Sequence, residues 1–159
     1  MTSGAQLDDE VKDIFQEVKV VKNDDDHMER ARLVVFGFKN DTIVVETIYR
    51  GSDLKDKDVF LSFKELLEPT KCHYILYDCH FKTTDSAKAE LVFVLWCPDT
   101  GPVKQKMNFA SSKDAFKNVL SGVKHNLQMN DPSDCSDREN FAKQLAKNIT
   151  ELEGVSLKK

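Results

Sequence analysis

The sequence predicts a single α/β (α+β) domain, with a mixed sheet of about five strands flanked by helices on both faces. Runs of β-branched and aromatic residues alternate with segments whose apolar residues recur at helical spacing. Two of the β-rich runs are separated only by Asn40-Asp41, a hairpin signal that requires at least one antiparallel pair. The length of 159 residues is typical of one domain, which would bury roughly two-thirds of its unfolded surface.

The N-terminal half is predicted to contain a tail, a helix and a hairpin. Residues 1–6 have no periodicity and are expected to be a flexible regulatory tail. Apolar residues then recur at helical spacing from Leu7 to Val18, behind acidic residues that favour a helix N-terminus. The polar segment 23–29 should be a solvated loop, because adjacent carboxylates cannot converge on one metal ion without other ligands. The hairpin strands should cover 32–39 and 42–49.

The middle of the chain is predicted to hold a short helix and two further strands. Asp58 is a plausible N-cap for a helix that ends near Pro69. Strands should follow at 73–81 and 90–96, and the nearly continuous apolar run of the second one indicates burial on both faces.

The C-terminal part is expected to add a short strand and a last helix. The strand should cover 126–129. Residues 137–149 have helical spacing that continues to Leu152, and the remainder should be a frayed end. The predicted organisation is therefore a tail at 1–6, a domain at 7–150 and a C-terminal tail at 151–159.

Residues 91–120 combine a buried strand with a helix that has two apolar faces. At 100° per residue, Phe109 and Phe116 share one face, whereas Val103 and Met107 lie nearly opposite, bordered by lysines. Both faces cannot point at one core. Either the helix breaks at Ser111-Ser112 and restarts from a capping box, or it continues and directs Met107 at a partner. Periodicity alone leaves both alternatives open.

Charge is unevenly distributed along the chain. The net charge is −4, yet residues 8–29 hold nine acids and three lysines while residues 82–125 hold seven lysines and four acids. A basic surface on an acidic protein favours an acidic protein or an anionic lipid as partner over nucleic acid. The N-terminus is too polar for a signal peptide, so we expect a cytoplasmic protein with four reduced cysteines. We also expect the protein to be a monomer.

The sequence contains no supported catalytic or metal site. Cys72-His73 and Cys79-His80 look like ligand pairs, but Cys72 and His80 would lie about 26 Å apart along a strand at about 3.3 Å per residue. Phosphate-binding glycine loops and hydrolase motifs are missing. Cys97 and His125 are the remaining pair for an enzyme, and nothing in the sequence brings them together. An enzyme that uses Cys97 or His125 is therefore possible but unsupported, and no metal site is expected.

Several segments resemble the actin-depolymerising factor/cofilin family. They are LVFVLWCPDTGPVKQKM at 91–107, ASSKDA at 110–115, GVKHNLQ at 122–128, CHYILYD at 72–78 and the start around Ser3-Gly4. The resemblance spans about residues 2–145. It implies the actin-depolymerising factor homology fold and binding to monomeric and filamentous actin, preferentially ADP-bound. It also implies filament severing and disassembly, and a long helix that turns Met107 outward while Phe109 and Phe116 are buried. The resemblance further implies that neither a cofactor nor catalysis is involved.

The resemblance assigns roles to particular positions. The implied monomer-contacting residues are Ser3, Gly4, Lys104, Lys106, Met107, Ser112 and Lys113. Ser3 matches the serine through which a kinase and a phosphatase switch family members off and on, since a phosphate adds about −1.5 to −2 charge. The implied residues for phosphoinositide binding and pH response are Lys104, Lys106, Lys124 and His125.

The departures from the family pattern fall on the filament-contacting surface. Its implied residues here are Lys82, Lys88, Arg138, Lys143 and Lys147, fewer cations than the family pattern has, which predicts weaker side-binding or less efficient severing. The basic nuclear-import run of some members is reduced to Arg30 and Arg32. A monomer-sequestering protein with weak severing is the alternative function.

Overall fold

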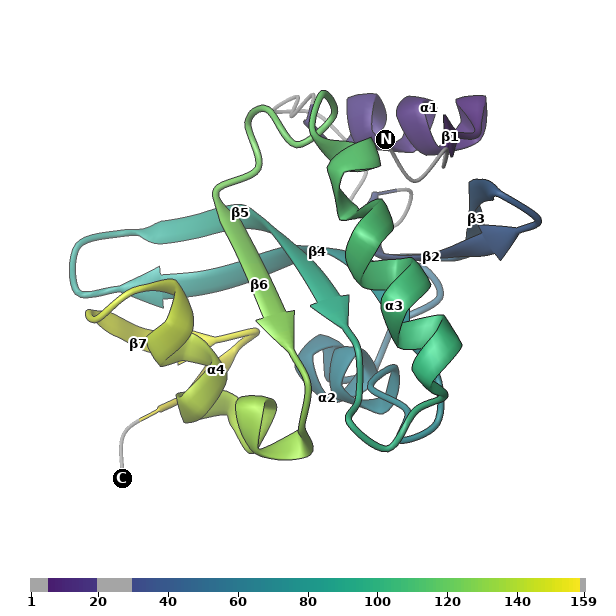
Figure 1. Ribbon diagram of the computed structural model, residues 1–159. Helices are drawn as coiled ribbons and strands as arrows, with labels where there is room; N and C mark the ends of the chain where they lie inside the picture. Colours follow the sequence, from purple (N-terminus) through teal and green to yellow (C-terminus); the bar gives the residue numbers. More distant parts are fainter. Residues whose placement is uncertain (1–5, 20–29, 158–159) are drawn as a thin grey trace.

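A mixed sheet runs through the centre of the domain, with helices on both faces (Figure 1). The computed structural model describes residues 6–19 and 30–157, so the predicted loop at 23–29 and most of the predicted tail lie outside the described residues. The sheet has eight strands in the order β1-β3-β2-β4-β5-β6, with β7 pairing to β4 and β8 to β7. Two pairs are parallel, β1–β3 and β5–β6, and the others are antiparallel. The predicted α/β fold class is confirmed.

Two apolar clusters lie on opposite faces of the sheet. One packs α1 (Asp9–Lys19) and α3 (Val103–Ser112) against the sheet, and the other packs α2 (Val59–Glu65) and α4 (Arg138–Leu145). The strands between them are buried on both sides, and Val92 to Trp96 of β5 (Ala87–Trp96) are no more than 1% exposed, as their apolar run predicts. None of the described helices is long and apolar enough to cross a membrane.

The N-terminal elements follow the predicted pattern. The four buried residues of α1 are Val11, Ile14, Phe15 and Val18. The hairpin strands β2 (Ala31–Lys39) and β3 (Thr42–Arg50) meet at a turn where Asn40 has φ +58°, a conformation that asparagine tolerates. The two-residue strand β1 (Gln6–Leu7) joins β3 in parallel, so the described structure places Gln6, predicted as part of the tail, in the sheet.

Helix α2 begins directly after Asp58, the N-cap residue that the sequence predicts. The side chain of Asp58 accepts hydrogen bonds from the backbone N–H groups of Phe60 and Leu61, which satisfies two donors that have no partner inside the helix. The long strand β4 (His73–Thr83) then pairs with β5 along ten consecutive positions. The predicted fifth strand is present as β6 (His125–Met129), and it pairs with β5 in parallel.

The prediction of a helix through Ile149 is wrong. Helix α4 ends at Leu145, and Ala146 is fully extended with φ −163° and ψ 161°. Residues Ile149–Leu152 form β7 instead, and a turn at Glu153 and Gly154 leads into β8 (Val155–Ser156). Leu152 is fully buried opposite Phe81. The predicted domain boundary at residue 150 thus falls within a strand of the sheet.

Candidate functional site

Helix α3 presents two exposed apolar side chains next to lysines. Val103 and Met107 are each 67% exposed, and Lys104 on the same side is exposed too. Phe109 and Phe116, on the opposite side, are 5% and 0% exposed. The expectation that Met107 points outward while both phenylalanines are buried is therefore confirmed. This surface, defined by Val103, Lys104, Lys106, Met107 and Lys113, is called the α3 face below.

The underside of α3 is tightly fixed to the sheet. The ring of Phe109 packs edge-on against Phe38 with 5.0 Å between centroids, and the hydroxyl of Tyr74 donates a hydrogen bond to the Phe109 carbonyl. The side-chain oxygen of Gln105 accepts a hydrogen bond from the backbone N–H of Cys72 at 2.6 Å. These contacts hold the α3 face in one orientation, which lowers the entropic cost of binding a partner.

The lysines of the α3 face differ in how they are held. The ammonium group of Lys106 donates to the carbonyl of Asp99 at 3.1 Å, so its position is fixed relative to the turn before the helix. Lys104 is exposed, whereas Lys106 and Lys113 are half-buried. Lys113 and Lys117 also line a hollow of about 560 Å³ with Leu120 and Asn126. Lys117 is not among the residues that the sequence predicts to contact a partner. Its position after Lys104, Lys106 and Lys113 in the same helical segment would have supported that prediction.

The expectation that Ser112 contacts a partner does not fit its position. Ser112 is fully buried, and its hydroxyl oxygen has no hydrogen-bond partner among the described residues. The capping box, which was one of the two alternatives for this helix, is not formed, because the Ser111 hydroxyl donates to the Asn108 carbonyl at 3.3 Å. Helix α3 passes directly into the 3₁₀ turn η1 (Lys113–Phe116), so Ser112 lies under the surface that its neighbours form.

A second group of cations lies at the far end of the β4–β5 hairpin. Lys82 and Lys88 are exposed on this hairpin, and Lys147 is exposed just before β7. The backbone N–H of Thr84 donates to the carbonyl of Asn148 at 3.2 Å, which brings the hairpin loop next to the segment after α4. The structure thus brings together two basic segments that are about 60 residues apart in sequence. Lys143 is exposed on α4 and lies 3.5 Å from Glu139.

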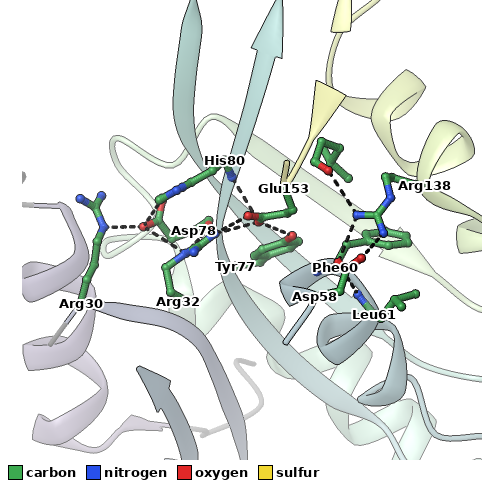
Figure 2. A network of polar contacts seen from close by, with 11 residues as sticks. Arg30, Arg32, Asp58, Phe60, Leu61, Tyr77, Asp78, His80, Arg138 and Glu153 are labelled. Carbon is green, nitrogen blue, oxygen red and sulfur yellow. Dashed lines mark hydrogen bonds and ion pairs between the residues drawn. The ribbon is translucent and has the colours of Figure 1, made fainter. Parts of the chain in front are cut away.

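Arg138, also predicted as a filament-contacting residue, differs from these exposed lysines. Its side chain is 14% exposed and forms an ion pair with Asp58. It also donates to the carbonyl of Leu152 at 3.2 Å and stacks over the ring of Phe60 at 4.9 Å (Figure 2). Arg138 therefore joins α4 to α2 and β7. Burial disfavours the Asp58 carboxylate, but hydrogen bonding to Arg138 and its charge outweigh this and lower the pKa of Asp58.

Sequence reasoning missed a largely buried polar network around Glu153 and Asp78. Figure 2 shows Glu153 in contact with Arg32 of β2 and Tyr77 of β4: Arg32 donates to both carboxylate oxygens at 2.6 and 2.8 Å, and the Tyr77 hydroxyl donates at 2.6 Å. Asp78, 2% exposed, accepts from Arg30 at 2.5 Å. Charged residues inside otherwise apolar strand runs were the available signal for this network.

The charge state of Asp78 follows from its neighbours. Burial opposes its ionisation, but the hydrogen bond from His80 and the positive charges of His80, Arg30 and Arg32 prevail and lower its pKa. Burial, with the Glu153 carboxylate beside it, raises the pKa of the Tyr77 hydroxyl well above its usual value. The Asp78 carboxylate therefore remains ionised at neutral pH and the Tyr77 hydroxyl remains protonated. The hydrogen bonds that Glu153 accepts from Tyr77 and from the backbone N–H of His80 fix the β7–β8 hairpin to β4.

Lys124 and His125 share one carboxylate. Lys124 lies 3.1 Å and His125 2.8 Å from the oxygens of Glu90. Burial works against the Glu90 carboxylate, yet the hydrogen bonds from His125 and Lys124 lower its pKa. His125 pairs with Val92 near the start of the parallel β5–β6 ladder, whereas α3 follows the end of β5. The four residues expected to bind phosphoinositides therefore fall into two groups, one at each end of the β5–β6 ladder.

Cys97 and His125 are also too far apart to act as a nucleophile and base. Cys97 follows Trp96, and His125 pairs with Val92, so five strand positions, about 16 Å at about 3.3 Å per residue, separate them. Among residues 6–19 and 30–157, no group of three or more histidine, cysteine or acidic side chains is placed to hold a metal ion.

Comparison with known proteins identifies the family. The family model described as cofilin/tropomyosin-type actin-binding protein matches residues 4–146. The chain belongs to the cofilin/ADF family of actin-binding proteins. Its members are not enzymes, so the open question for this chain is how it engages actin and with what effect on filaments.

Solved structures agree with this assignment. The cofilin of Streptomyces griseoflavus is similar with 26% identity and a TM-score of 0.73, over 91% of this chain and 98% of that one. The actin depolymerizing factor of Toxoplasma gondii is 32% identical with a TM-score of 0.56, over 86% and 98%. Actin depolymerization factor 2 of Plasmodium berghei, at 24% identity and a TM-score of 0.72 over 91% and 97%, supports the fold.

Proposed function

We propose that this cofilin/ADF family member binds monomeric and filamentous actin, severs filaments and promotes their disassembly. The observation that carries the proposal is the α3 face, where two apolar side chains, each 67% exposed, stand beside lysines on a helix whose other side is fixed to the sheet. Rigid exposed apolar groups flanked by one sign of charge are typical of an interface with an oppositely charged partner.

The proposed contact combines an apolar centre with a charged surround. Met107 and Val103 enter an apolar depression on actin, where the flexible thioether of Met107 adapts to its shape. Lys104, Lys106 and Lys113 pair with acidic actin groups, which accelerates association and fixes the orientation. Ser3 and Gly4 would extend the contact, although they lie outside the described residues.

Severing follows from differential affinity, with no cofactor or covalent chemistry. A protein that binds one filament geometry more tightly than another shifts the filament toward that geometry. A preference for ADP-bound subunits would direct this effect to older filament segments. Boundaries between decorated and bare filament then become the weak points at which the filament breaks.

Regulation is proposed to act partly on the α3 face and partly at the separate site of His125. A phosphate on Ser3, added by a kinase and removed by a phosphatase, would repel acidic groups of actin or fold the tail onto Lys104 and Lys106. Phosphoinositide headgroups would compete with actin for lysines. Protonation of His125 beside Glu90 would add a pH response.

The strength of filament side-binding separates the leading proposal from its alternative. Lys82, Lys88 and Lys147 are exposed and gathered at one end of the molecule, which supports side-binding. Arg138 is occupied by Asp58 and is not available for it, which favours the alternative of a monomer-sequestering protein with weak severing. Single-filament imaging of the wild type over a range of concentrations decides between them: severing at substoichiometric occupancy supports the first, and monomer depletion without side-binding supports the second.

The α3 face is tested with Met107→Ala in filament co-sedimentation and monomer-binding assays. Truncation of a central apolar anchor typically costs 1–2 kcal/mol or more, so affinity should fall by about 5–30-fold or more. Folding stability should change by less than about 0.5 kcal/mol, because the side chain is largely exposed. Lys55→Glu is the control, since Lys55 is exposed next to Leu54, which packs on the opposite face of the sheet from α3. Unchanged actin binding by Met107→Ala would reject the proposed interface.

A further inference from the structure

Cys72 and Cys97 face each other across the end of the β4–β5 ladder. The register pairs His73 with Trp96, so Cys72 and Cys97 occupy the next opposing positions. Neither backbone N–H is donated to the other residue: that of Cys72 goes to the Gln105 side chain and that of Cys97 to the Met129 carbonyl. Opposed residues that exchange no backbone hydrogen bonds have the closer side chains of the two antiparallel pair types.

The two thiols are in direct contact under α3. Their sulfur atoms are 3.1 Å apart, and the residues are 3% and 4% exposed. The thiol of Cys97 also donates to the carbonyl of Lys106 at 3.7 Å. Burial, together with the hydrogen bond and charge of Cys97, raises the pKa of Cys72 to about 12. The thiol form therefore prevails while α3 covers the pair.

The other two cysteines have different surroundings. Cys79 and Cys135 are fully buried in the apolar cluster with α2 and α4, whereas Cys72 and Cys97 belong to the cluster with α1 and α3. The sheet thus separates them from the pair. A reaction that needs two adjacent thiols is confined to Cys72 and Cys97.

We propose that Cys72 and Cys97 form a redox-active dithiol, which low-molecular-weight disulfides such as glutathione disulfide close into an intramolecular disulfide. Opposed cross-strand positions suit the Cα separations that disulfides require, and only a short movement is needed to bring the sulfur atoms to bonding distance. The site lies directly beneath the turn of α3 that carries Lys106, a residue of the α3 face.

The reaction has two balanced steps. One protein thiolate attacks glutathione disulfide, which breaks its S–S bond, forms a mixed disulfide and releases one glutathione thiolate. The second protein thiolate then attacks the protein sulfur of the mixed disulfide, forms the Cys72–Cys97 bond and releases the second glutathione thiolate. Two electrons pass to the oxidant, and the two thiol protons end on two glutathione molecules.

Burial makes the first step slow, and the proximity of the two sulfur atoms makes the second step fast. The oxidant reaches the sulfur atoms only when the first turns of α3 open locally, and Pro102 at the N-cap of this helix supplies no side-chain hydrogen bond. Once a mixed disulfide forms, the second sulfur is already adjacent. Closure removes the S–H donor that serves the Lys106 carbonyl, so oxidation alters the hydrogen bonding beneath the α3 face.

The test incubates the folded protein with glutathione disulfide and counts thiols after denaturation. Thiols should fall from four to two per chain, with a mass loss of two hydrogen atoms and no adduct. Fragmentation of the linked peptides should assign the bond to Cys72 and Cys97. The matched variant Cys79→Ala/Cys135→Ala should fall from two thiols to none, and Cys97→Ala should not lose two hydrogen atoms.

Each alternative result overturns the proposal. Retention of four thiols on a timescale that oxidises a partly unfolded control would mean that the pair is inert packing. A bond that involves Cys79 or Cys135, or stable glutathione adducts on both Cys72 and Cys97, would refute the pairing. If the Cys79→Ala/Cys135→Ala variant does not fold, fragmentation of the wild-type protein still assigns the bond. The readout does not involve actin, so its failure leaves the proposed function unaffected.

Discussion

Replacement of Arg138 by alanine separates a structural role from a filament-contacting one. The side chain of Arg138 is 14% exposed, and its guanidinium group bridges the N-cap residue of α2, Asp58, to the carbonyl of Leu152 in β7 (Figure 2). It also covers the ring of Phe60. The Arg138→Ala variant loses all three contacts and leaves the Asp58 carboxylate with only its two backbone donors.

The expected cost lies between that of a surface pair and that of a buried pair. Exposed ion pairs contribute about 0.2–1 kcal/mol, and removal of one partner of a fully buried pair costs about 3–5 kcal/mol. The Asp58 and Arg138 side chains are 24% and 14% exposed, so we expect a loss of about 2 kcal/mol. For a domain of this size, that corresponds to a drop of roughly 4–8 °C in Tm.

The stability that the Asp58 carboxylate contributes decreases as the pH falls. Because the pKa of Asp58 is lowered in the folded state, its contribution is fully present above the unfolded pKa of about 3.9 and is lost as pH falls through the folded value. The difference in stability between wild type and Arg138→Ala should therefore be constant near neutral pH and shrink in acid.

Urea unfolding of wild type, Arg138→Ala, Asp58→Ala and the double variant measures the coupling directly. We expect a coupling free energy of about 1–2 kcal/mol. Lys143→Ala is the control, because its exposed ammonium group should change stability by less than about 0.5 kcal/mol. If Arg138→Ala is as stable as this control and instead weakens filament binding, the structural role assigned to Arg138 is wrong.

Two further substitutions test the apolar clusters and the Glu90 contacts. Phe116→Ala removes a fully buried ring beneath η1 and should cost about 3–5 kcal/mol in urea unfolding; a loss below about 1 kcal/mol would show that the cluster collapses around the gap. Glu90→Gln removes a carboxylate whose pKa is lowered, so the wild type should lose more stability than the variant as pH falls from above the unfolded value of about 4.3 through the lower folded value. The unfolding free energies of wild type and Glu90→Gln are measured as a function of pH in acid. Identical slopes for the two proteins would contradict the prediction.

Local signals in the sequence predicted most of the fold. The apolar spacing of α1, the Asn40-Asp41 turn and the Asp58 cap each act within a few residues, and the structure contains all three. The end of the last helix could not be predicted from such local signals. The spacing of Ile149 and Leu152 fits a helix as well as a strand, and pairing with β4, more than 60 residues earlier in the chain, selects the strand.

The residues of the candidate site also differ in whether a local sequence signal predicts their position. Exposure of Met107 could be predicted from the resemblance, whereas periodicity alone left two alternatives. Arg138 looked like one more basic residue on a helix, because its partner Asp58 is 80 positions away. The network of Arg32, Tyr77 and Glu153 is equally non-local, with separations of up to 121 positions. Such contacts depend on the completed fold and have no short-range signature.

Ser112 is the residue at which resemblance and structure differ most, and its substitution decides between them. Its buried hydroxyl has no partner among the described residues, and an unpaired buried hydroxyl costs about 1–3 kcal/mol. Alanine also has the higher helix propensity. Ser112→Ala should therefore increase the free energy of unfolding by about 1 kcal/mol and leave actin binding unchanged, as measured by urea unfolding and co-sedimentation. Weaker actin binding at unchanged stability would mean that Ser112 becomes exposed when the partner binds, and that the α3–η1 junction rearranges in the complex.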